Sequence, residues 1–455
     1  MAQELVYGQK DDELYAGTPS LSTLKLLLSW YCTMWKADDV VKIIDIKCAF
    51  LYGKARRALF IELPEQDAKS GGRLVGRLKK AMYGTRDAPL IWRATVDAFM
   101  RKAGFLIATL QPGVYYHVTR GLRVMTHVDD FLLTGNVKHA EWFEAELKKE
   151  YDITVTTLGE NFEKKGKYLN REITWTKEGI QIEGDQKHVQ ILLDESGMTE
   201  CKGIATPVAK DEGDSVLHHD QVLNAKSATQ FRRAAARINY MSQDRPDIST
   251  ASRLLSQGMK EPKASDELKL KRVMRYLKDH PRCISLMKWQ DENSELRLLV
   301  DSDWAGDKAS RKSCSGGCIM LGSHLICHWS KMQGTIALSS GEAELNAAVK
   351  GMSEGIGVLE LSAEIGMNLK MSISTDASVC KSILLRHGSG RIKHLSTKQL
   401  WIQGALESYG VKVLKIPRSI NNADLMTHGC NAEDFHDHLD RLRQDLKKQI
   451  PPRMS

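Results

Sequence analysis

The sequence feature that most limits how this chain can fold is a pair of adjacent carboxylates inside an apolar segment. Residues Val124 to Leu133 are typical of two short strands joined by a tight turn, and Asp129 and Asp130 lie at that turn. Two like charges beside apolar neighbours are driven towards protonation unless a cation, most simply a divalent metal, neutralises them. Asp-Asp pairs also occur at solvated turns, so the pair alone leaves a metal site and an ordinary turn open.

A second acid upstream favours the metal site. Asp45 lies on an apolar strand that begins at Ile43 and is followed by residues that can turn into a helix. An acid at a strand end and a pair on a hairpin turn can converge on two metal ions about 4 Å apart. That arrangement stabilises the attacking and leaving oxygens in nucleotidyl transfer, which is the chemistry that these acids indicate.

Further motifs follow in a fixed order along the chain. They are Asp45–Leu51, Ala81–Pro89 followed by Trp92, Ala205–Val208, Gln243–Ile248, Asp301–Asp307 and Ala337–Leu345. In these motifs and in their order the chain resembles the copia-type retrotransposon reverse transcriptases, and the resemblance covers nearly the whole chain.

This resemblance implies an α+β protein with a truncated reverse-transcriptase palm and fingers, a mainly helical thumb and connection, and a ribonuclease H-like α/β domain. The expected segments are 1–185 for the palm with partial fingers, 186–290 for the thumb and connection, 291–430 for the ribonuclease H-like domain, and 431–455 for a charged C-terminal tail. The chain begins close to the Asp45 motif, so we expect the family's preceding fingers segment to be missing. We find no aspartic-protease motif, zinc knuckle or integrase domain, and expect part of a polyprotein or a reading frame derived from one.

For the polymerase site, the resemblance assigns Asp45, Asp129 and Asp130 to the metal ions. It assigns Phe50 to the aromatic gate that excludes a ribonucleotide 2′-hydroxyl, although Phe50 can equally serve plain core packing. The chain departs from the family at His127, where Tyr is usual, and at Asn170, where Gly is usual.

The C-terminal half carries its own set of acids. An apolar strand ends in Asp301, and another expected strand runs into Asp376. Glu342 and Glu344 are two residues apart on an expected helix, so they do not share a face and only one can meet Asp301. The resemblance selects Glu344 and adds Asp424 as the fourth acid. These four are implied to bind two Mg²⁺ ions, with Mn²⁺ as an alternative, and to cut the RNA strand of an RNA–DNA hybrid.

Composition agrees with an enzyme that acts on nucleic acid. The 455 residues allow two or three domains, and the net charge of +8 suits a polyanionic partner. The amino terminus has neither the basic start nor the apolar core of a signal peptide, and no apolar run approaches the roughly 20 residues that span a bilayer. Nine cysteines without regular spacing favour reduced thiols in an intracellular protein.

One cluster of potential zinc ligands has a simpler interpretation. It comprises Cys314, Cys318, His324, Cys327 and His328. The spacing lacks two close ligand pairs around a finger loop, and Arg311–Gly322 is instead typical of a turn followed by a strand. We therefore favour a structural role over a zinc site.

Periodicity predicts helices over 23–35, 89–103 and 136–151, and a strand pair over 168–175 and 179–182. Residues 187–280 are mainly helical, with a loop at 211–220. The helix at 266–279 carries five basic residues that could grip a phosphate backbone or form a solvated face. After residue 431 we expect a short helix and then disorder.

The sequence thus predicts an RNA-directed DNA polymerase with ribonuclease H activity. Its partners would be an RNA template, a DNA primer, RNA–DNA hybrid and deoxynucleoside triphosphates, with no membrane, in the cytoplasm, virus-like particles or nucleus. One alternative keeps only the nuclease, beside a vestigial polymerase half. Another is a non-catalytic nucleic-acid-binding relic, and the oligomeric state stays open.

Overall fold

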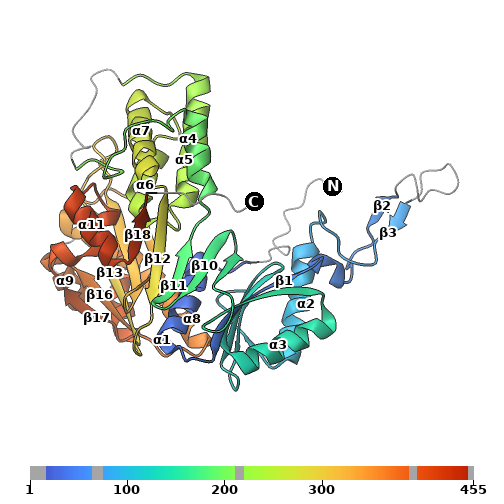
Figure 1. The fold of residues 1–455 in the computed structure, drawn as a ribbon. Coiled ribbons are helices and arrows are strands. Elements are labelled where there is room, and N and C mark those ends of the chain that lie inside the picture. Colours follow the sequence, from blue (N-terminus) through green and yellow to red (C-terminus); the bar gives the residue numbers. More distant parts are fainter. Residues whose placement is uncertain (1–16, 64–74, 211–219, 389–396, 449–455) are drawn as a thin grey trace. The chain divides into compact units, whose positions relative to one another are not determined.

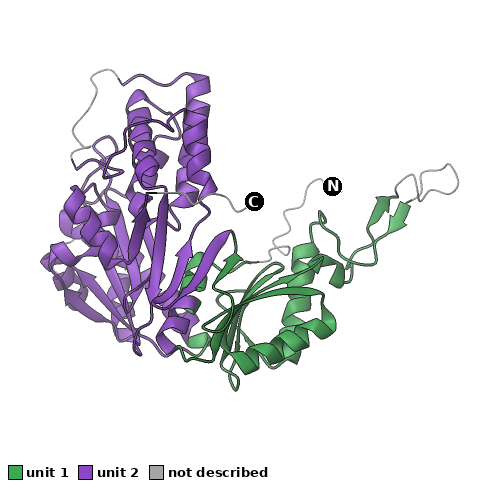
Figure 2. Cartoon of the chain, viewed as in Figure 1, with its two compact units in different colours: residues 1–27, 35–169, 363–366 green, residues 28–34, 170–362, 367–455 purple. Residues whose placement is uncertain are grey.

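The computed structural model describes residues 17–63, 75–210, 220–388 and 397–448, and the chain divides into two compact units (Figures 1 and 2). Unit 1 comprises residues 1–27, 35–169 and 363–366, and unit 2 comprises residues 28–34, 170–362 and 367–455. Helix α1 (Leu21–Met34) contributes residues to both units. None of the helices within the described ranges combines the length and apolar character of a membrane span.

Unit 1 is built on an antiparallel sheet in the order β4-β5-β6-β7-β1-β8. The strands are β1 (Asp39–Ile46), β4 (Leu106–Ile107), β5 (Val114–His117), β6 (Leu122–His127), β7 (Asp130–Asn136) and β8 (Ile153–Leu158). Helices α2 (Ala88–Lys102) and α3 (Val137–Glu150) pack against this sheet, and Trp92, Phe131 and Phe143 are among the side chains of the shared core. The smaller elements are η2 (Ala49–Tyr52), β2 (Phe60–Glu62), β3 (Val75–Arg77) and β9 (Lys165–Tyr168).

Unit 2 begins with a layer of helices beside a sheet. Four strands of this sheet follow the order β18-β12-β11-β10, with bounds β10 (Arg171–Thr176), β11 (Gly179–Glu183), β12 (Arg282–Lys288) and β18 (Gln444–Lys447). The helices are α4 (Lys187–Ser196), α5 (Ala225–Met241), η4 (Pro246–Ile248), α6 (Ser249–Gln257) and α7 (Ala264–Asp279). Within this layer of helices, a buried ion pair joins Arg245 and Asp247 at 2.6 Å. The Tyr276 hydroxyl donates a hydrogen bond to Asp247 at 2.8 Å.

The second sheet of unit 2 has the order β15-β14-β13-β16-β17. Strands β13, β14 and β15 pair antiparallel, whereas β16 and β17 run parallel to β13. The bounds are β13 (Glu295–Asp303), β14 (Cys314–Leu321), β15 (His324–Met332), β16 (Lys370–Thr375) and β17 (Lys412–Lys415). The helical elements of this part are α8 (Ser340–Glu364), α9 (Ser378–Leu385), α10 (Thr397–Ser408), η5 (Arg418–Ile420), η6 (Asn422–Met426) and α11 (Ala432–Arg441).

Helix α8 lies very close to strand β13 at one glycine. A Cβ atom on Gly351 would meet the Val300 Cγ1 atom at 2.5 Å, so a larger residue would push the helix away from the strand. Glu344 lies seven residues earlier on the same helix, about two turns away. The close approach therefore helps to hold Glu344 against the end of β13.

The α+β fold class is confirmed, and so are the three helices predicted over 23–35, 89–103 and 136–151, with bounds that differ by one or two residues. The strand predicted over 168–175 begins later than expected. Leu169 and Asn170 have φ of 50° and 61°, so they form a turn between β9 and β10. The loop predicted at 211–220 lies outside the described residues except for its last position.

The short helix expected after residue 431 is confirmed as α11, whereas the disorder expected to follow it is wrong for the residues described there. Helix α11 buries Phe435 and Leu439 in the main core of unit 2, and β18 pairs with β12. The same core contains side chains from 186–290 and from the second sheet of unit 2, for example Leu299 of β13. Residues from three of the four predicted segments therefore lie in one compact unit. The boundaries predicted between these segments are untested by the structure and stay predictions.

Candidate active sites

The predicted polymerase acids come together at one end of the unit 1 sheet. Strand β1 pairs with β7 so that Asp45 lies opposite Asp130, and the Ile46 N–H donates to the Asp129 carbonyl at 3.1 Å. Asp45 is exposed between the buried Ile44 and Ile46. Burial first, and then the charges of Asp129 and Asp45, raise the pKa of Asp130 above its usual range. Three carboxylates that repel one another at a strand end can accept divalent cations.

The turn that carries these acids is fixed by its backbone. Val128 has a φ of 59°, a left-handed conformation that is strained for a β-branched residue. The Trp92 indole N–H donates to the Val128 carbonyl at 2.6 Å. The tryptophan of the Ala81–Pro89 motif region therefore anchors the Asp129–Asp130 turn.

Phe50 lies on η2, shortly after Asp45. Its ring is 4.5 Å from the Tyr83 ring, centroid to centroid, and its side chain is only partly buried. The position near the acids fits a gate, and the packing on Tyr83 fits the core alternative. The structure therefore keeps both interpretations of Phe50.

The acids predicted for the nuclease site gather more tightly. Asp301 lies near the end of β13, Glu344 on the first turns of α8, and Asp376 directly after β16. Their ligand atoms lie within 4.8 Å of one another. A second group with the same spacing consists of Asp301, Asp424 and His428. Among the described residues no such group includes Asp45, Asp129 or Asp130.

Burial and mutual repulsion perturb these nuclease acids strongly. Burial raises the pKa of Asp301 to about 7, and the charges of Asp424 and Asp376 add to the effect. Burial also raises the pKa of Glu344 to about 8, with contributions from Asp301 and Asp376. The pKa of Asp376 is raised, chiefly by burial. Buried carboxylates this close together destabilise the folded state unless a cation neutralises them. Such a set is typical of a metal site.

Asp424 is held in place by the segment that follows β17. The Asn421 side chain donates to the Val300 carbonyl at 3.0 Å and accepts from the Ala423 N–H, so η6 begins directly beside β13. Burial acts to raise the pKa of Asp424, but hydrogen bonding and charge from His428, together with Arg418, hold it below its usual value. Asp424 is thus an ionised partner beside the more easily protonated Asp301.

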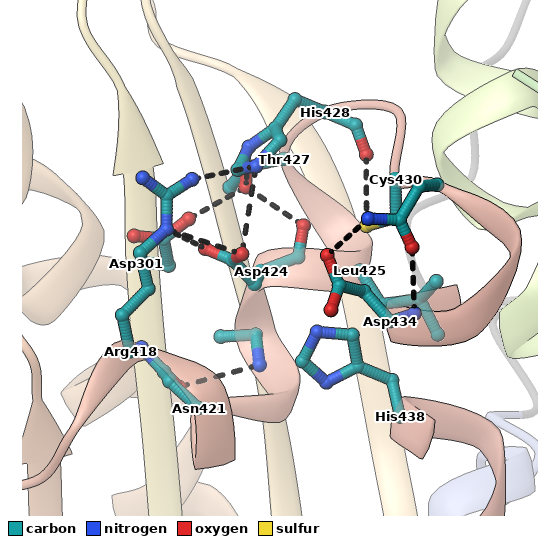
Figure 3. A network of polar contacts seen from close by, with 12 residues as sticks. Asp301, Arg418, Asn421, Asp424, Leu425, Thr427, His428, Cys430, Asp434 and His438 are labelled. Carbon is teal, nitrogen blue, oxygen red and sulfur yellow. Dashed lines mark hydrogen bonds and ion pairs between the residues drawn. The ribbon is translucent and has the colours of Figure 1, made fainter. Parts of the chain in front are cut away.

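Figure 3 shows a network that links Asp301 and Asp424 through three further residues. The Thr427 hydroxyl lies 2.5 Å from Asp301 Oδ2 and 2.9 Å from His428 Nδ1. The Arg418 guanidinium lies 3.3 Å from both Asp424 oxygens and 2.8 Å from His428 Nε2. Sequence reasoning missed Arg418, Thr427 and His428, although Thr427 and His428 follow Asp424 at the helical spacings of three and four residues.

The donor set fits a divalent metal. The Glu344 Oε2 atom is buried and has no hydrogen-bond partner among the described residues, beside two other carboxylates. A cavity of about 390 Å³ opens onto the acids and is lined by Asp301, Glu344, Asp376, Arg418 and His428, among others. Carboxylate oxygens at this spacing are the ligands that Mg²⁺ and Mn²⁺ prefer.

Two neighbouring predictions can be compared with the structure. Glu342 accepts hydrogen bonds from the Leu338 N–H at 2.8 Å and from Gln399 at 3.2 Å, and it belongs to neither metal-binding group of the described residues.

The region considered for zinc shows other contacts. Both ring nitrogens of His324 form hydrogen bonds, one with Ser29 and one with the Lys288 carbonyl. The cysteines of that region belong to neither metal-binding group of the described residues. These hydrogen bonds agree with a structural role for the region.

The basic helix predicted over 266–279 is α7. Lys269 and Lys271 pair with Asp266 and Glu267 of its own first turn. These pairs favour the solvated-face alternative at two of the five basic positions.

Comparison with known proteins places these features in a family context. Residues 4–210 match the family described as "Reverse transcriptase (RNA-dependent DNA polymerase)". The chain is 27% identical over 427 residues to the retrovirus-related Pol polyprotein of transposon TNT 1-94 from Nicotiana tabacum, covering 91% of this chain and 31% of that protein. It is 25% identical over 414 residues to the Pol polyprotein of transposon RE1 from Arabidopsis thaliana, covering 88% and 27%. The chain therefore spans about a third or less of the length of these relatives.

A shorter relative and one solved structure extend the comparison. An uncharacterised mitochondrial protein of Arabidopsis thaliana is 30% identical over 231 residues, which cover 49% of this chain and 89% of that protein. The foamy viral protease-reverse transcriptase in complex with RNA/DNA hybrid aligns with a TM-score of 0.47 at 12% identity, over 88% of this chain and 46% of that one.

Proposed function

The chain belongs to the copia-type retrotransposon Pol family, and from this premise we propose that it is an RNA-directed DNA polymerase that also has ribonuclease H activity. The observation that carries the proposal is the grouping of Asp301, Glu344 and Asp376, with Asp424 on the other side of Asp301. Asp301, Glu344 and Asp376 line one cavity, and together with Asp424 they would form a site for phosphodiester cleavage assisted by two metal ions.

In the proposed nuclease reaction, Asp301 lies between the two groups and contributes to both. With Asp301, Glu344 and Asp376 would bind one metal ion, and Asp424 would bind the other. The metal ions, when bound, supply activated water and stabilise the charge that develops on the phosphate. The Thr427 hydroxyl orients the Asp301 carboxylate, which fixes the centre of the site. The proposed substrate is the RNA strand of an RNA–DNA hybrid, recognised through its 2′-hydroxyls.

In the proposed polymerase reaction, Asp45, Asp129 and Asp130 hold the divalent ions at the end of β1 and at the β6–β7 turn. Trp92 keeps that turn in its left-handed conformation. Phe50, one turn after the β1 acid, would contact the sugar of the incoming deoxynucleotide. The partners are an RNA template, a DNA primer and deoxynucleoside triphosphates.

The nuclease activity is tested with the purified chain, Mg²⁺ and an RNA–DNA hybrid labelled on the RNA strand. Wild type is expected to cut the RNA, and Asp301→Asn is expected to abolish cutting. Glu342→Gln is the matched control, because Glu342 is also acidic and two residues from Glu344 but lies outside the metal-binding groups. Equal cleavage by wild type and Asp301→Asn would contradict the proposed site.

The polymerase activity is tested by extension of a labelled DNA primer on an RNA template, with Asp129→Asn as the inactive comparison. Extension by wild type alone supports the full proposal. Cleavage without extension, from a folded protein that binds hybrid, would leave the nuclease-only alternative. Binding without either activity would leave the non-catalytic relic.

A further inference from the structure

We propose that His428 is a third ligand of the divalent metal held by Asp301 and Asp424, so that this half of the nuclease centre is a mixed carboxylate–imidazole site that prefers Mn²⁺ to Mg²⁺. The inference rests on the proposed function only in requiring that a divalent metal binds these acids. It extends that function, because the four acids alone would make both halves purely carboxylate sites.

The three proposed ligands lie close together in the structure. One ligand atom from each of Asp301, Asp424 and His428 lies within 4.8 Å of the others. Asp301 and Asp424 are buried, and His428 is partly buried at the wall of the cavity. Asp424 lies in η6 and His428 two residues after its end, and His428 Nε2 lies 3.5 Å from Asp424 Oδ2.

The second support is the orientation of the imidazole. Arg418 Nη2 lies 2.8 Å from His428 Nε2, and a guanidinium can only donate hydrogen bonds. Nε2 therefore accepts this bond, so its lone pair faces the position of the Arg418 guanidinium, and Asp424 Oδ2 lies 3.5 Å from the same nitrogen. Once Arg418 moves away, that lone pair is available to a metal ion beside the carboxylate.

The third support is the partner of the other ring nitrogen. With Nε2 as acceptor, Nδ1 carries the proton and donates to the Thr427 hydroxyl at 2.9 Å. That hydroxyl in turn donates to Asp301 Oδ2 at 2.5 Å. Metal-binding histidines usually donate their second N–H to a neighbouring polar group, which fixes the tautomer and the ring orientation. Here the same hydroxyl orients both His428 and Asp301.

The fourth support is that a cation already lies at this position. The Arg418 guanidinium contacts both oxygens of Asp424 and Nε2 of His428, which are the atoms a metal would use. The Arg418 side chain is 65% exposed, so it can swing into solvent without breaking a packed core. Metal binding would therefore exchange an exposed guanidinium for the ion.

The ligand types set the preference for a metal. The Asp301–Glu344–Asp376 group offers only oxygen, which suits Mg²⁺. The Asp301–Asp424–His428 group adds an imidazole nitrogen, which favours first-row transition ions over Mg²⁺. Mn²⁺ accepts both ligand types and can also support phosphodiester cleavage.

The proposal is tested on the full chain loaded with Mn²⁺, by electron spin-echo spectroscopy that detects the coupling of a ¹⁴N nucleus to the bound ion. Wild type is expected to show imidazole coupling that disappears in His428→Gln. The Mn²⁺ affinity should fall by about 10- to 100-fold in that variant, whereas the Mg²⁺ affinity should change far less. His436→Gln, at an exposed histidine of α11, is the matched control and should keep the coupling.

The outcomes separate this inference from the proposed function. Mn²⁺ bound without ¹⁴N coupling, or coupling that survives His428→Gln in a variant that melts like wild type, would overturn the role of His428 alone. Failure of Mn²⁺ and Mg²⁺ to bind at all would overturn the metal site on which the proposed function depends. As a second variant, Arg418→Gln should tighten Mn²⁺ binding, and weaker binding would refute the exchange with the guanidinium.

Discussion

Replacing Asp301 by asparagine is expected to stabilise the metal-free protein at pH 8, although it removes the central acid of the proposed nuclease site. Burial raises the pKa of Asp301 from its ordinary value of 3.8 to about 7. At about 1.4 kcal/mol per unit, the ionised side chain destabilises the fold by up to roughly 4 kcal/mol. Asparagine is neutral, and its oxygen can still accept the hydrogen bond from Thr427. Relaxation around the site reduces the expected gain to about 1–3 kcal/mol.

The sign of the pH dependence follows from the direction of the shift. In the folded state Asp301 keeps its proton up to about pH 7, whereas in the unfolded chain it loses the proton near its ordinary value of 3.8. The stability is therefore complete below that ordinary value and falls as the pH rises through the folded-state pKa. Glu344, whose pKa is raised to about 8, acts in the same direction. The advantage of Asp301→Asn should consequently be absent near pH 4 and greatest at pH 8.

Calorimetric melting in EDTA at pH 5 and pH 8 measures the effect. A gain of 1 kcal/mol corresponds to a shift of about 2–4 °C in Tm for a unit of this size. Saturating Mg²⁺ should reverse the order of the two proteins, because the wild type binds the ion more tightly and binding stabilises the folded state. Glu342→Gln, which removes an acid two residues from Glu344 but outside both metal-binding groups, is the control. If Asp301→Asn melts at or below the wild type at pH 8 in EDTA, the reasoning from buried charge is wrong.

Three further predictions concern other parts of the molecule. Phe50→Ala should let the polymerase incorporate ribonucleotides, and unchanged sugar selectivity in primer extension would leave Phe50 as a packing residue. Asp247→Asn should lower the free energy of unfolding by about 3–5 kcal/mol in denaturant titrations, because it leaves the buried Arg245 charge uncompensated; a loss under 1 kcal/mol would contradict this. Trp92→Phe should cost about 1–2 kcal/mol and reduce primer extension, because the Val128 carbonyl loses its donor; normal extension would show that the turn holds without it.

The sequence predicted the parts of this fold that are encoded locally. The three early helices show periodic apolar residues, the strands before Asp45 and Asp301 show apolar runs, and the strand before Asp376 alternates apolar and polar residues. The turn at Leu169 and Asn170 was missed, because an apolar residue in the left-handed region leaves no pattern in a sequence.

Features that depend on distant parts of the chain were the ones not predicted. Strand β18 is short and mostly polar, and it is ordered by pairing with β12, far earlier in the sequence. Thr427 orients the site through its hydrogen bond to Asp301, which lies far away in the sequence on β13. His428 contributes through its contacts with Arg418 and Asp424. The acids themselves were identified through motifs, but the groups that orient them could be recognised only once the chain had folded.

The hydrogen bond between Thr427 and Asp301 joins residues 126 positions apart, and this separation has a consequence for synthesis of the chain. A ribosome that adds about 5–20 residues per second needs roughly 6–25 s to pass from one to the other. During that interval β13 has emerged, but Asp424, Thr427 and His428 have not yet been made. The proposed nuclease centre therefore stays incomplete for that interval after β13 has been made, and it can assemble only once residues 424–428 have followed.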